Sequence, residues 1–327
     1  MAKILGIGNA LVDLLIRIDD DNLLKELDLP KGSMTLVDEE KKTLIAEKSK
    51  HLPREMASGG SAANTIHGLA KLGVETAYIG TIGKDETGEF FREDLVQNHI
   101  HPMMNHSDTP TGIASTLISK DSERTFGTYL GAAIELAGDS LKPEQFDGFD
   151  MMHVEGYLVQ NHELLETALR LAKEAGLKIS LDLASYNVVE ANLEFLHKMV
   201  EKYVDIIFAN EEEAKAFTGQ EPESALHTIA GKTGISVVKV GSKGSFVKSD
   251  DKLFVVEPIP AQVQDTTGAG DAYAAGFLYG LTRGYTYQDS GFIGSLLASV
   301  TIETIGARIK DDQWPGIFEK IATLEKV

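Results

Sequence analysis

The stretch DTTGAGD, Asp265–Asp271, combines residue types that can bind an anion and accept a proton. Gly268, Ala269 and Gly270 precede a helix-like segment, and the free backbone N–H groups at such a helix start can bind phosphate. Asp271 follows directly, so a carboxylate stands beside the expected anion site. The plainer alternative is a tightly packed helix start in which Asp271 is only a favourable first-turn acid.

Other phosphate-binding signatures are absent from the sequence. There is no G-x-x-x-x-G-K-S/T, which excludes a P-loop, and neither H-R-D nor D-F-G occurs, which excludes a protein-kinase site. GIGNAL matches a dinucleotide fingerprint only in part, because Leu11 replaces the third glycine after Gly6 and Gly8. A dinucleotide-binding dehydrogenase is therefore a minor alternative.

A second glycine pair precedes another helix-like stretch, in ASGGSAANTIHGLAKLG. Gly59 and Gly60 allow a ligand to approach the backbone closely. Asn64, on the first helical turn, can donate and accept hydrogen bonds, which suits a sugar hydroxyl. These features indicate a polar ligand site, and the alternative is a simple loop followed by a polar helix start.

Short apolar runs alternate with helix-like patterns and would position these residues. Strands are expected at KILGIG, TAYIG, MMHVEG, LKISLDL, VDIIFA and ISVVKV. Helices are expected at SAANTIHGLAKLG, TGEFFREDLVQN and residues 163–175, 191–201 and 211–217. This alternation predicts an α/β fold with a mainly parallel sheet that is covered by helices on both faces.

Two segments interrupt the alternation. Residues 11–38 contain the alternating LVDLLIRID, and residues 101–130 contain TGIASTLIS, KDSE and RTFGTYL, which read as strand, turn and strand. We expect these segments to form a small lid of antiparallel strands. Because no linker or internal repeat divides the chain, residues 1–327 are expected to form a single domain that carries this lid.

The run NHIHPMMNH places His99, His101 and His106 close together. Pro102 stands among them, and no acidic residue is evident that could support metal-binding histidines, so a zinc site is disfavoured. We interpret the run as the connection from the main domain to the lid.

Composition narrows the class of protein. Of 327 residues, 43% are hydrophobic and 25% are charged, which is typical of a globular protein with a substantial core. The net charge of -19 disfavours binding to nucleic acids and to anionic membranes. No apolar run approaches about 20 residues and the start of the chain lacks signal-peptide features, so a cytoplasmic protein is expected. The absence of cysteine excludes disulfides and thiolate catalysis.

Five short motifs occur in one order along nearly the whole chain: GGSAAN, GTIGKDETG, NEEE, KVGSKG and DTTGAGD. Together they resemble the ribokinase-like (PfkB-type) kinases of sugars and nucleosides. The resemblance implies a three-layer α-β-α fold with a partly β lid, and transfer of the ATP γ-phosphoryl group to a ligand hydroxyl. It assigns the anion hole to Gly268, Ala269 and Gly270, and it makes Asp271 the base that takes the hydroxyl proton. Both roles suit phosphoryl transfer, which depends on positioning and charge stabilisation.

The same resemblance implies where the donor nucleotide and magnesium bind. Asn210 and Glu213 match the family's N-x-x-E, which is linked to magnesium and phosphate positioning, although Asn210 would also serve as a helix cap. Gly241 and Gly244 match a nucleotide-contacting loop, for which an ordinary hairpin turn is the alternative. Ser295 stands where relatives often carry Asn or His beside the ATP base.

Three further positions can be interpreted from the resemblance. Asp265 and Thr267 match positions near a monovalent-cation site in some relatives, which makes K+ a candidate ligand. Asp85, in GKDETG, is interpreted as a structural turn and helix start. Arg124, in ERTFGTYLGAA, matches a lid arginine near the transferred phosphate, and the alternative is a solvated hairpin charge.

Within the family, GIGNALVDLL and DDNLLKELDLPKGSMTLVD resemble the adenosine kinases more specifically. This resemblance implies that Asp13 binds ribose hydroxyls, since one carboxylate can accept from two adjacent hydroxyls. Tyr157 and Tyr186 lie where adenosine kinases carry aromatic residues, and Met34 lies where they carry an aliphatic one. The alternative is that these tyrosines belong to the edge of the core.

The expected function is an ATP- and Mg2+-dependent kinase of the adenosine 5'-hydroxyl, which forms AMP and ADP. The alternatives are a kinase of a free sugar, a sugar phosphate or another nucleoside, and a ligand-binding protein that kept the fold without turnover. Its partners are expected to be small molecules. A monomer and a homodimer are both expected forms, because lid strands can cover their own site or pair with another chain.

Overall fold

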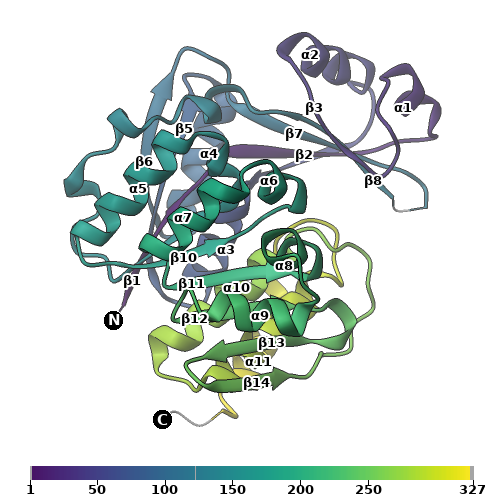
Figure 1. Cartoon of the computed structure of the whole chain (residues 1–327). Helices are drawn as coiled ribbons and strands as arrows, with labels where there is room; N and C mark the ends of the chain where they lie inside the picture. Colours follow the sequence, from purple (N-terminus) through teal and green to yellow (C-terminus); the bar gives the residue numbers. More distant parts are fainter. Residues whose placement is uncertain (1, 122, 325–327) are drawn as a thin grey trace.

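Two β-sheets of unequal size organise the molecule. The computed structural model describes residues 2–121 and 123–324, and its larger sheet has the strand order β14-β13-β12-β11-β10-β9-β1-β5-β6 (Figure 1). The strands from β12 to β6 in this order run parallel, whereas β13 and β14 form an antiparallel extension at one edge. The strand bounds are β1 Lys3–Ile7, β5 Glu75–Gly83, β6 Ile100–Ser107, β9 Met151–Glu155, β10 Lys178–Asp182, β11 Ile206–Asn210, β12 Ile235–Lys239, β13 Ser245–Ser249 and β14 Lys252–Val256. The predicted mainly parallel sheet is thus confirmed.

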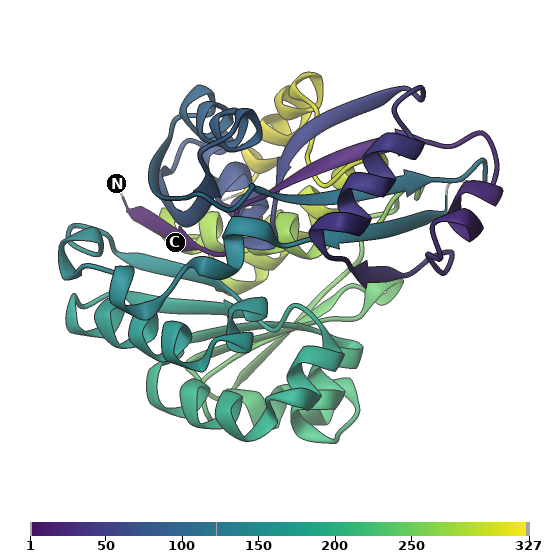
Figure 2. The ribbon, with the colours of Figure 1, turned by 90° about the horizontal axis from the view of Figure 1, so that it is seen from above.

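Helices cover both faces of this sheet, which gives the three layers seen from above in Figure 2. One face packs against α5 His162–Glu174, α6 Tyr186–Ala191, α7 Leu193–Tyr203, α8 Glu211–Thr218 and α9 Pro222–Ala230. The other face packs against α3 Ser61–Lys71, α4 Glu86–Gln97, α10 Ala269–Arg283, α11 Tyr287–Thr301 and α12 Trp314–Ile321. Within the described part of the chain, no helix combines the length and the apolar character that a bilayer span requires.

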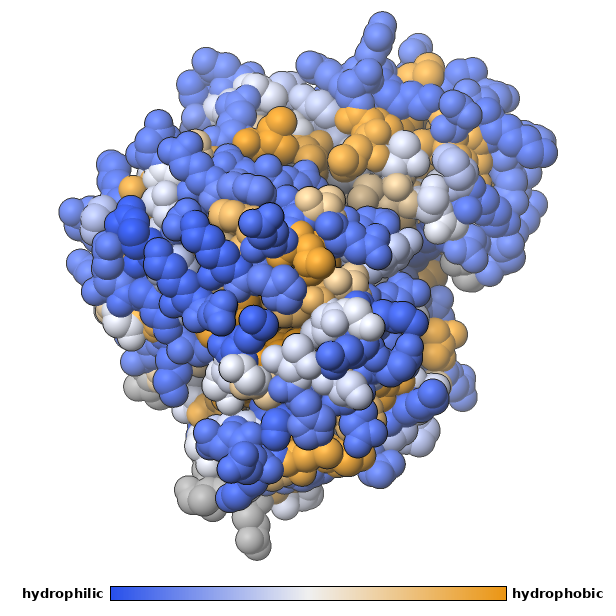
Figure 3. All heavy atoms as spheres, in the orientation of Figure 1, coloured by the Kyte–Doolittle hydropathy of each residue, from blue (hydrophilic) through white to orange (hydrophobic). Residues whose placement is uncertain are grey.

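The smaller sheet, which we call the lid sheet, has the strand order β3-β8-β7-β2-β4. Its strands are β2 Leu11–Arg17, β3 Met34–Leu36, β4 Arg54–Gly59, β7 Gly112–Ile118 and β8 Arg124–Tyr129, and the short helices α1 Asn22–Glu26 and α2 Glu39–Lys48 lie beside it. It has its own small core, in which Ile16, Ile45 and Leu117 are fully buried. The lid sheet projects to one side of the layered body, and hydrophobic side chains gather where the two meet (Figures 1 and 3).

The lid sheet differs from the sequence prediction in its boundaries and its pairing. β6 is an edge strand of the larger sheet rather than a connection or a part of the lid, and an edge position tolerates Pro102 because fewer N–H groups must pair there. The lid sheet also gains β4, whose sequence REMASG shows little apolar alternation. Its pairing is mixed rather than antiparallel, since β2 runs parallel to β7 and β3 parallel to β8.

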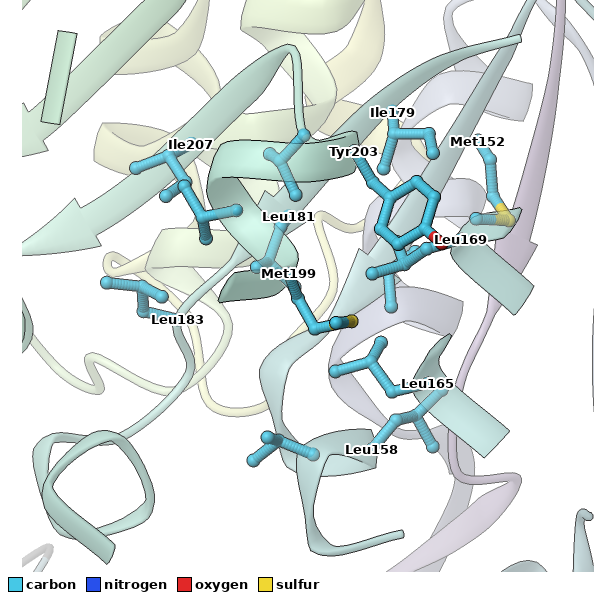
Figure 4. Packing of buried hydrophobic residues seen from close by; sticks show 14 of the residues in the cluster. Met152, Leu158, Leu165, Leu169, Ile179, Leu181, Leu183, Met199, Tyr203 and Ile207 are labelled. Atoms are coloured by element: carbon cyan, nitrogen blue, oxygen red, sulfur yellow. The ribbon is translucent and has the colours of Figure 1, made fainter. Parts of the chain in front are cut away.

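The core on one face of the larger sheet fixes the strands whose ends carry polar residues. Leu181 of β10 and Ile207 of β11 pack with Leu165 and Leu169 of α5 and with Met199 of α7, and all five are fully buried (Figure 4). The apolar residues of α5 recur at intervals of three and four, which places them on the one stripe that faces the sheet. The carboxyl ends of these strands are therefore held on a rigid base.

Candidate active site

The start of α10 is the segment predicted to bind phosphate. Gly268 precedes the helix in a left-handed conformation, with φ of 76°, and no side chain of the described residues caps the first turn. A Cβ at Gly268 would lie 2.6 Å from Ala307 Cα, and one at Gly270 would lie 3.0 Å from Lys239 Nζ. The N–H groups of this turn and the nearby ammonium group therefore form a close cradle whose chemistry fits phosphate oxygens.

Asp271 lies on the first turn of α10 and is held by α3. Its Oδ1 accepts a hydrogen bond from Ser61 Oγ at 2.7 Å, and its Oδ2 accepts one from Asn64 Nδ2 at 3.1 Å. Burial raises the pKa of Asp271 to about 7, although the hydrogen bonds from Ser61 and Asn64 oppose this rise. A carboxylate with this pKa can take a proton from a hydroxyl near neutral pH.

A buried ion pair lies behind the cradle. Lys239 Nζ lies 3.0 Å from Asp182 Oδ2, and their side chains are only 16% and 7% exposed. Sequence reasoning missed both residues, although a signal existed. Glu155, Asp182, Asn210 and Lys239 each end one of four adjacent parallel strands, and ligands of open α/β sheets bind outside the carboxyl ends of the strands.

Asn210 and Glu213 form a reciprocal cap at the start of α8. Asn210 Oδ1 accepts from the Glu213 N–H at 2.8 Å, and Glu213 Oε2 accepts from the Asn210 N–H at 2.8 Å. The capping role that was the alternative for Asn210 is therefore present. Burial, with repulsion from Asp182, raises the pKa of the Glu213 carboxyl to about 7. Glu213 thus combines a structural role with a position close to the buried ion pair.

Arg124 and Asp265 join the lid sheet to the loop before α10. Arg124 Nη2 lies 2.7 Å from Asp265 Oδ2, and both side chains are less than a tenth exposed. Arg124 Nη1 donates to Thr267 Oγ1 at 3.2 Å, while Asp265 also accepts from the N–H and hydroxyl of Thr267 and from the Gly306 N–H. Arg124 is therefore not a solvated hairpin charge. The guanidinium is the charge partner of Asp265 here, and the monovalent-cation site expected at Asp265 and Thr267 stays a prediction.

Asp13 lies in β2 against the end of β4. A Cβ at Gly59 would lie 2.4 Å from Asp13 Oδ2, so only glycine lets the carboxylate approach the backbone here. Burial raises the pKa of Asp13 to about 6, and the positive charges of Arg308 and Arg124 oppose this rise. Gly60 has φ of 93°, and a Cβ there would lie 2.3 Å from the Asn9 carbonyl oxygen. The structure therefore requires both glycines of the pair.

A cavity of about 690 Å³ lies between the lid sheet and the body. One part of its wall is polar and includes Asn9, Gly60, Ser61 and Glu155. The rest of the wall combines apolar and polar side chains. Its apolar residues are Leu11, Met34, Leu36, Ala114, Leu130, Ala133, Ile134, Leu158, Leu164 and Val188, and its polar residues include Thr128, Gln160, Asn161, His162, Ser185 and Asn187. Since Ser61 also donates to Asp271, the polar part of the wall adjoins the carboxylate that can act as a base.

Of the three residues predicted to contact adenine, two line the cavity and one does not. Met34 and Tyr157 line the cavity, and the Tyr157 hydroxyl donates to the Ala184 carbonyl at 3.4 Å. Tyr186 is not among the lining residues, although its neighbours Ser185 and Asn187 are, and its side chain is 43% exposed. The position predicted for this aromatic contact thus lies between two residues of the wall and is not itself among the lining residues.

Glu155 is a buried cavity residue that sequence reasoning missed. It is 1% exposed, and its Oε1 accepts from the N–H and the side-chain amide of Asn9, at 2.9 and 2.6 Å. Its Oε2 accepts from the Ala62 N–H at 3.0 Å. Glu155 therefore ties the turn after β1 to the start of α3, which carries two of the hydrogen-bond donors to Asp271.

The nucleotide contacts expected at Gly241, Gly244 and Ser295 stay predictions. Gly241 and Gly244 lie between β12 and β13 with φ of 55° and 90°, and a Cβ at Gly244 would lie 2.0 Å from the Val256 carbonyl oxygen. Ser295 lies in α11 and is 8% exposed. Asp85 caps α4 by accepting from the Gly88 N–H at 2.7 Å, which agrees with its interpretation as a helix start.

Metal binding would rely on few protein ligands. Across residues 2–121 and 123–324, no three His, Asp or Glu side chains form a group that could hold a metal ion. Asp182 pairs with the Lys239 ammonium group of the cradle, and the charges of both residues act on Glu213, so these two carboxyl groups lie close to the cradle. An ion carried by the phosphates of a nucleotide fits this donor set better than a dedicated protein site.

Comparison with known proteins agrees with the geometry. Residues 33–314 match the sequence profile of the pfkB family carbohydrate kinases. The chain resembles the structure of a probable sugar kinase protein from Rhizobium etli CFN 42, with 31% identity, a TM-score of 0.88 and coverage of 98% of both chains. It also resembles adenosine kinase from Sinorhizobium meliloti, with 32% identity, a TM-score of 0.87 and coverage of 98% of this chain and 99% of the other. Adenosine kinase of Schizophyllum commune is 27% identical over an alignment of 348 positions, gaps included, that covers 96% of this chain and 98% of that protein.

Proposed function

Because the chain belongs to the pfkB family of carbohydrate kinases, we propose that it is an adenosine kinase that transfers the ATP γ-phosphoryl group to the 5'-hydroxyl, forming AMP and ADP. Family membership makes the chain an ATP-dependent phosphotransferase that acts on an alcohol. The choice of adenosine rests on the cavity and on the similarity to adenosine kinases over nearly the whole chain.

The observation that carries this proposal is the two-part wall of the cavity. A free pentose presents hydroxyls on most of its surface and would leave apolar walls without partners. A nucleoside has a flat apolar base joined to a polar sugar, so its base suits the wall that includes Met34, Leu36 and Leu130. Its sugar suits the part near Ser61, where Asp271 can receive the proton of the reacting hydroxyl.

The donor side of the proposal uses the cradle at α10. The N–H groups of Gly268, Ala269 and Gly270 and the ammonium group of Lys239 would stabilise the transferring phosphoryl oxygens. Magnesium supplies neutralisation of phosphate charge, and Asp182 and Glu213 would hold its water shell. Asp13 would bind the sugar hydroxyls that do not react.

A kinase of a free sugar is the second candidate. It is favoured by the polar groups near Asp271 and by the similarity to the probable sugar kinase protein of Rhizobium etli CFN 42. A kinase of ribose would use the polar part of the wall and leave the apolar part without a partner.

A panel of acceptors with ATP and magnesium separates these candidates. Adenosine, inosine, 2'-deoxyadenosine and ribose are compared by ADP release, and the products are identified by chromatography. We expect kcat/KM for adenosine to exceed that for ribose by at least about 100-fold, because ribose gains nothing from the apolar wall. Efficient phosphorylation of ribose with adenosine inert would replace the proposal by the second candidate, and adenosine binding without ADP release would contradict both.

A further inference from the structure

Three consecutive residues after α11 touch three different parts of the site. The Gly306 N–H donates to Asp265 Oδ2 at 2.8 Å, in the loop before α10. Ala307 lies against Gly268, where a Cβ would come within 2.6 Å of its Cα. Arg308 then reaches the end of β4 and the helix α4. Segment 306–308 therefore connects the phosphate cradle to the base of the lid sheet.

The guanidinium of Arg308 forms a closed network under the lid sheet. Its Nη1 donates to Asp94 Oδ2 at 2.7 Å, and its Nη2 donates to Ser58 Oγ at 2.6 Å. Ser58, which is 1% exposed, in turn donates to Asp94. The side chains of Arg308 and Asp94 are only 16% and 21% exposed. A buried charge in such a place persists only where it is paired and hydrogen-bonded, so the position of Arg308 is fixed.

This network adjoins the carboxylate of Asp13. Ser58 is followed by Gly59, and the three carboxylate atoms of Asp13 lie within 2.6 Å of where a Cβ of Gly59 would be. The charged groups that act on Asp13 are Arg308 most strongly, then Arg124, and Asp265 in the opposite sense. Each guanidinium is paired with a carboxylate of its own, Arg124 with Asp265 and Arg308 with Asp94. Of the two, Arg308 acts on Asp13 more strongly.

We propose that Arg308 is a positioning residue for the acceptor: it fixes the end of β4 against which Asp13 lies, and its charge keeps that carboxylate ionised under the lid sheet. The inference rests on the proposed function only in that Asp13 binds acceptor hydroxyls, whichever acceptor carries them. Arg308 acts through Asp13 and Ser58 and takes no part in the transfer step. Its loss should therefore affect the binding of the acceptor more than turnover, and more strongly at low pH.

The test compares four variants with the parent protein. Arg308→Met removes the charge, Arg308→Lys keeps it, and Arg308→Met with Asp94→Asn removes the charge without leaving a buried carboxylate unpaired. Arg170→Gln is the matched control, because Arg170 pairs with Glu174 on an exposed turn of α5. Thermal unfolding is measured for each, and acceptor KM, ATP KM and kcat are followed from about pH 5 to pH 9. The acceptor is the one that the parent turns over, and its dissociation constant is measured by calorimetry.

The expected result is a selective and pH-dependent loss. For Arg308→Met and for the double variant, the acceptor KM and dissociation constant should rise about fivefold near pH 6 and about ninefold near pH 5, as expected if the pKa of Asp13 rises by about one unit from its value of about 6. The rise should be smaller near pH 8, with kcat and ATP KM within about twofold of the parent there. Arg308→Lys should restore most of the binding, and Arg170→Gln should match the parent.

Two other results would overturn the inference. If the double variant unfolds like the parent and binds the acceptor normally at every pH, Arg308 contributes only to folding. If acceptor binding falls by the same factor at every pH, Arg308 does not keep Asp13 ionised. Failure of the proposed function is a separate result, because it appears in the parent as inactivity toward adenosine.

Discussion

Asp271 is an acidic residue next to a cradle for phosphate. Its surroundings explain how a carboxyl group and a bound anion can lie side by side. Burial favours the neutral carboxyl, whereas Ser61 and Asn64 donate hydrogen bonds that favour the carboxylate. The resulting pKa of about 7 lets the residue change charge during a reaction at neutral pH. A proton taken from the acceptor hydroxyl would also reduce the negative charge beside the phosphoryl group.

Asp271→Asn keeps the shape of the side chain and removes the base. We expect the rate of ADP formation in a single turnover to fall about 10²- to 10⁴-fold, the usual range for loss of a general base. ATP affinity should stay the same or improve, because a negative charge next to the phosphates is lost. Glu174→Gln, on the exposed turn of α5, is the control. A rate within a few-fold of the parent would leave Asp271 as only a first-turn acid.

The pH dependence of turnover should show this base. kcat should rise with pH along a limb centred near the pKa of about 7 and level off above it, because only the carboxylate can accept the proton. Glu213 has a similar pKa but is expected to act on magnesium and phosphate. Glu213→Gln should therefore lower the rate while the limb stays in place. If the rise of kcat near pH 7 disappears in Glu213→Gln, that rise reports the ionisation of Glu213 rather than that of Asp271.

The same pKa has a consequence for stability. The pKa of Asp271 rises on folding from an ordinary value of 3.8 to about 7, so between these values the folded protein holds a proton that the unfolded chain has released. The carboxylate therefore destabilises the fold increasingly as the pH rises through this window. The free energy of unfolding of Asp271→Asn, measured in urea titrations, should increase relative to that of the parent from about pH 5 to pH 8, because only the parent loses stability as its carboxyl ionises. A difference that does not change with pH would contradict this assignment of the pKa.

At the scale of elements, residues that follow strong local patterns could be predicted from the sequence. The glycine pair before α3 and the glycines before α10 mark helix starts, and the family resemblance placed Asp271 and Arg124 near the transferred phosphate. Glu155, Asp182, Lys239 and Arg308 could not be found in this way, because their neighbours in sequence are ordinary strand and loop residues. Their importance comes from pairing across strand ends and loops, which local periodicity does not record.

Errors in the predicted elements have the same origin. β6 carries a proline and two histidines, so its pattern resembles a loop, yet pairing with β5 makes it a strand. β4 contains one large apolar residue, Met56, which is 45% exposed, and it becomes a strand through its pairing with β2. In both cases a neighbouring strand supplies the order that the local sequence lacks.

The contact between β8 and the loop before α10 can be tested as a unit. Arg124→Gln leaves Asp265 buried without its charge partner, so we expect a loss of about 3–5 kcal/mol in the free energy of unfolding, together with slower turnover. Adding Asp265→Asn removes the unpaired charge and should restore most of the stability. Urea unfolding and steady-state turnover are measured on both variants. Full recovery of turnover in the double variant would show that Arg124 has no role beyond neutralising Asp265.

At the scale of the whole molecule, a layered body supports the phosphate cradle and a lid sheet with its own small core completes the cavity. The two are tied by Arg124 to Asp265 and by Arg308 to Ser58, and the charges of both guanidinium groups act on Asp13. These ties are largely buried and each contains a charged group, whereas Met34 and Leu36 of the lid sheet, which line the cavity, are each 53% exposed. Movement of the lid sheet should therefore require less free energy at Met34 and Leu36 than at the two charged ties.

The net charge of -19 gives the whole molecule a field that repels ATP but not an uncharged acceptor. The local positive groups at the cradle are few, and Lys239 is already paired with Asp182. Raising the ionic strength from about 20 to 200 mM with a large organic cation shortens the screening length from about 20 to 7 Å, which weakens the long-range repulsion more than the contacts. We expect kcat/KM for ATP to rise about twofold to fivefold at constant excess magnesium, while kcat/KM for adenosine stays constant as the internal control. A fall in kcat/KM for ATP would mean that the local charges of the cradle, rather than the overall field, govern the approach of the nucleotide.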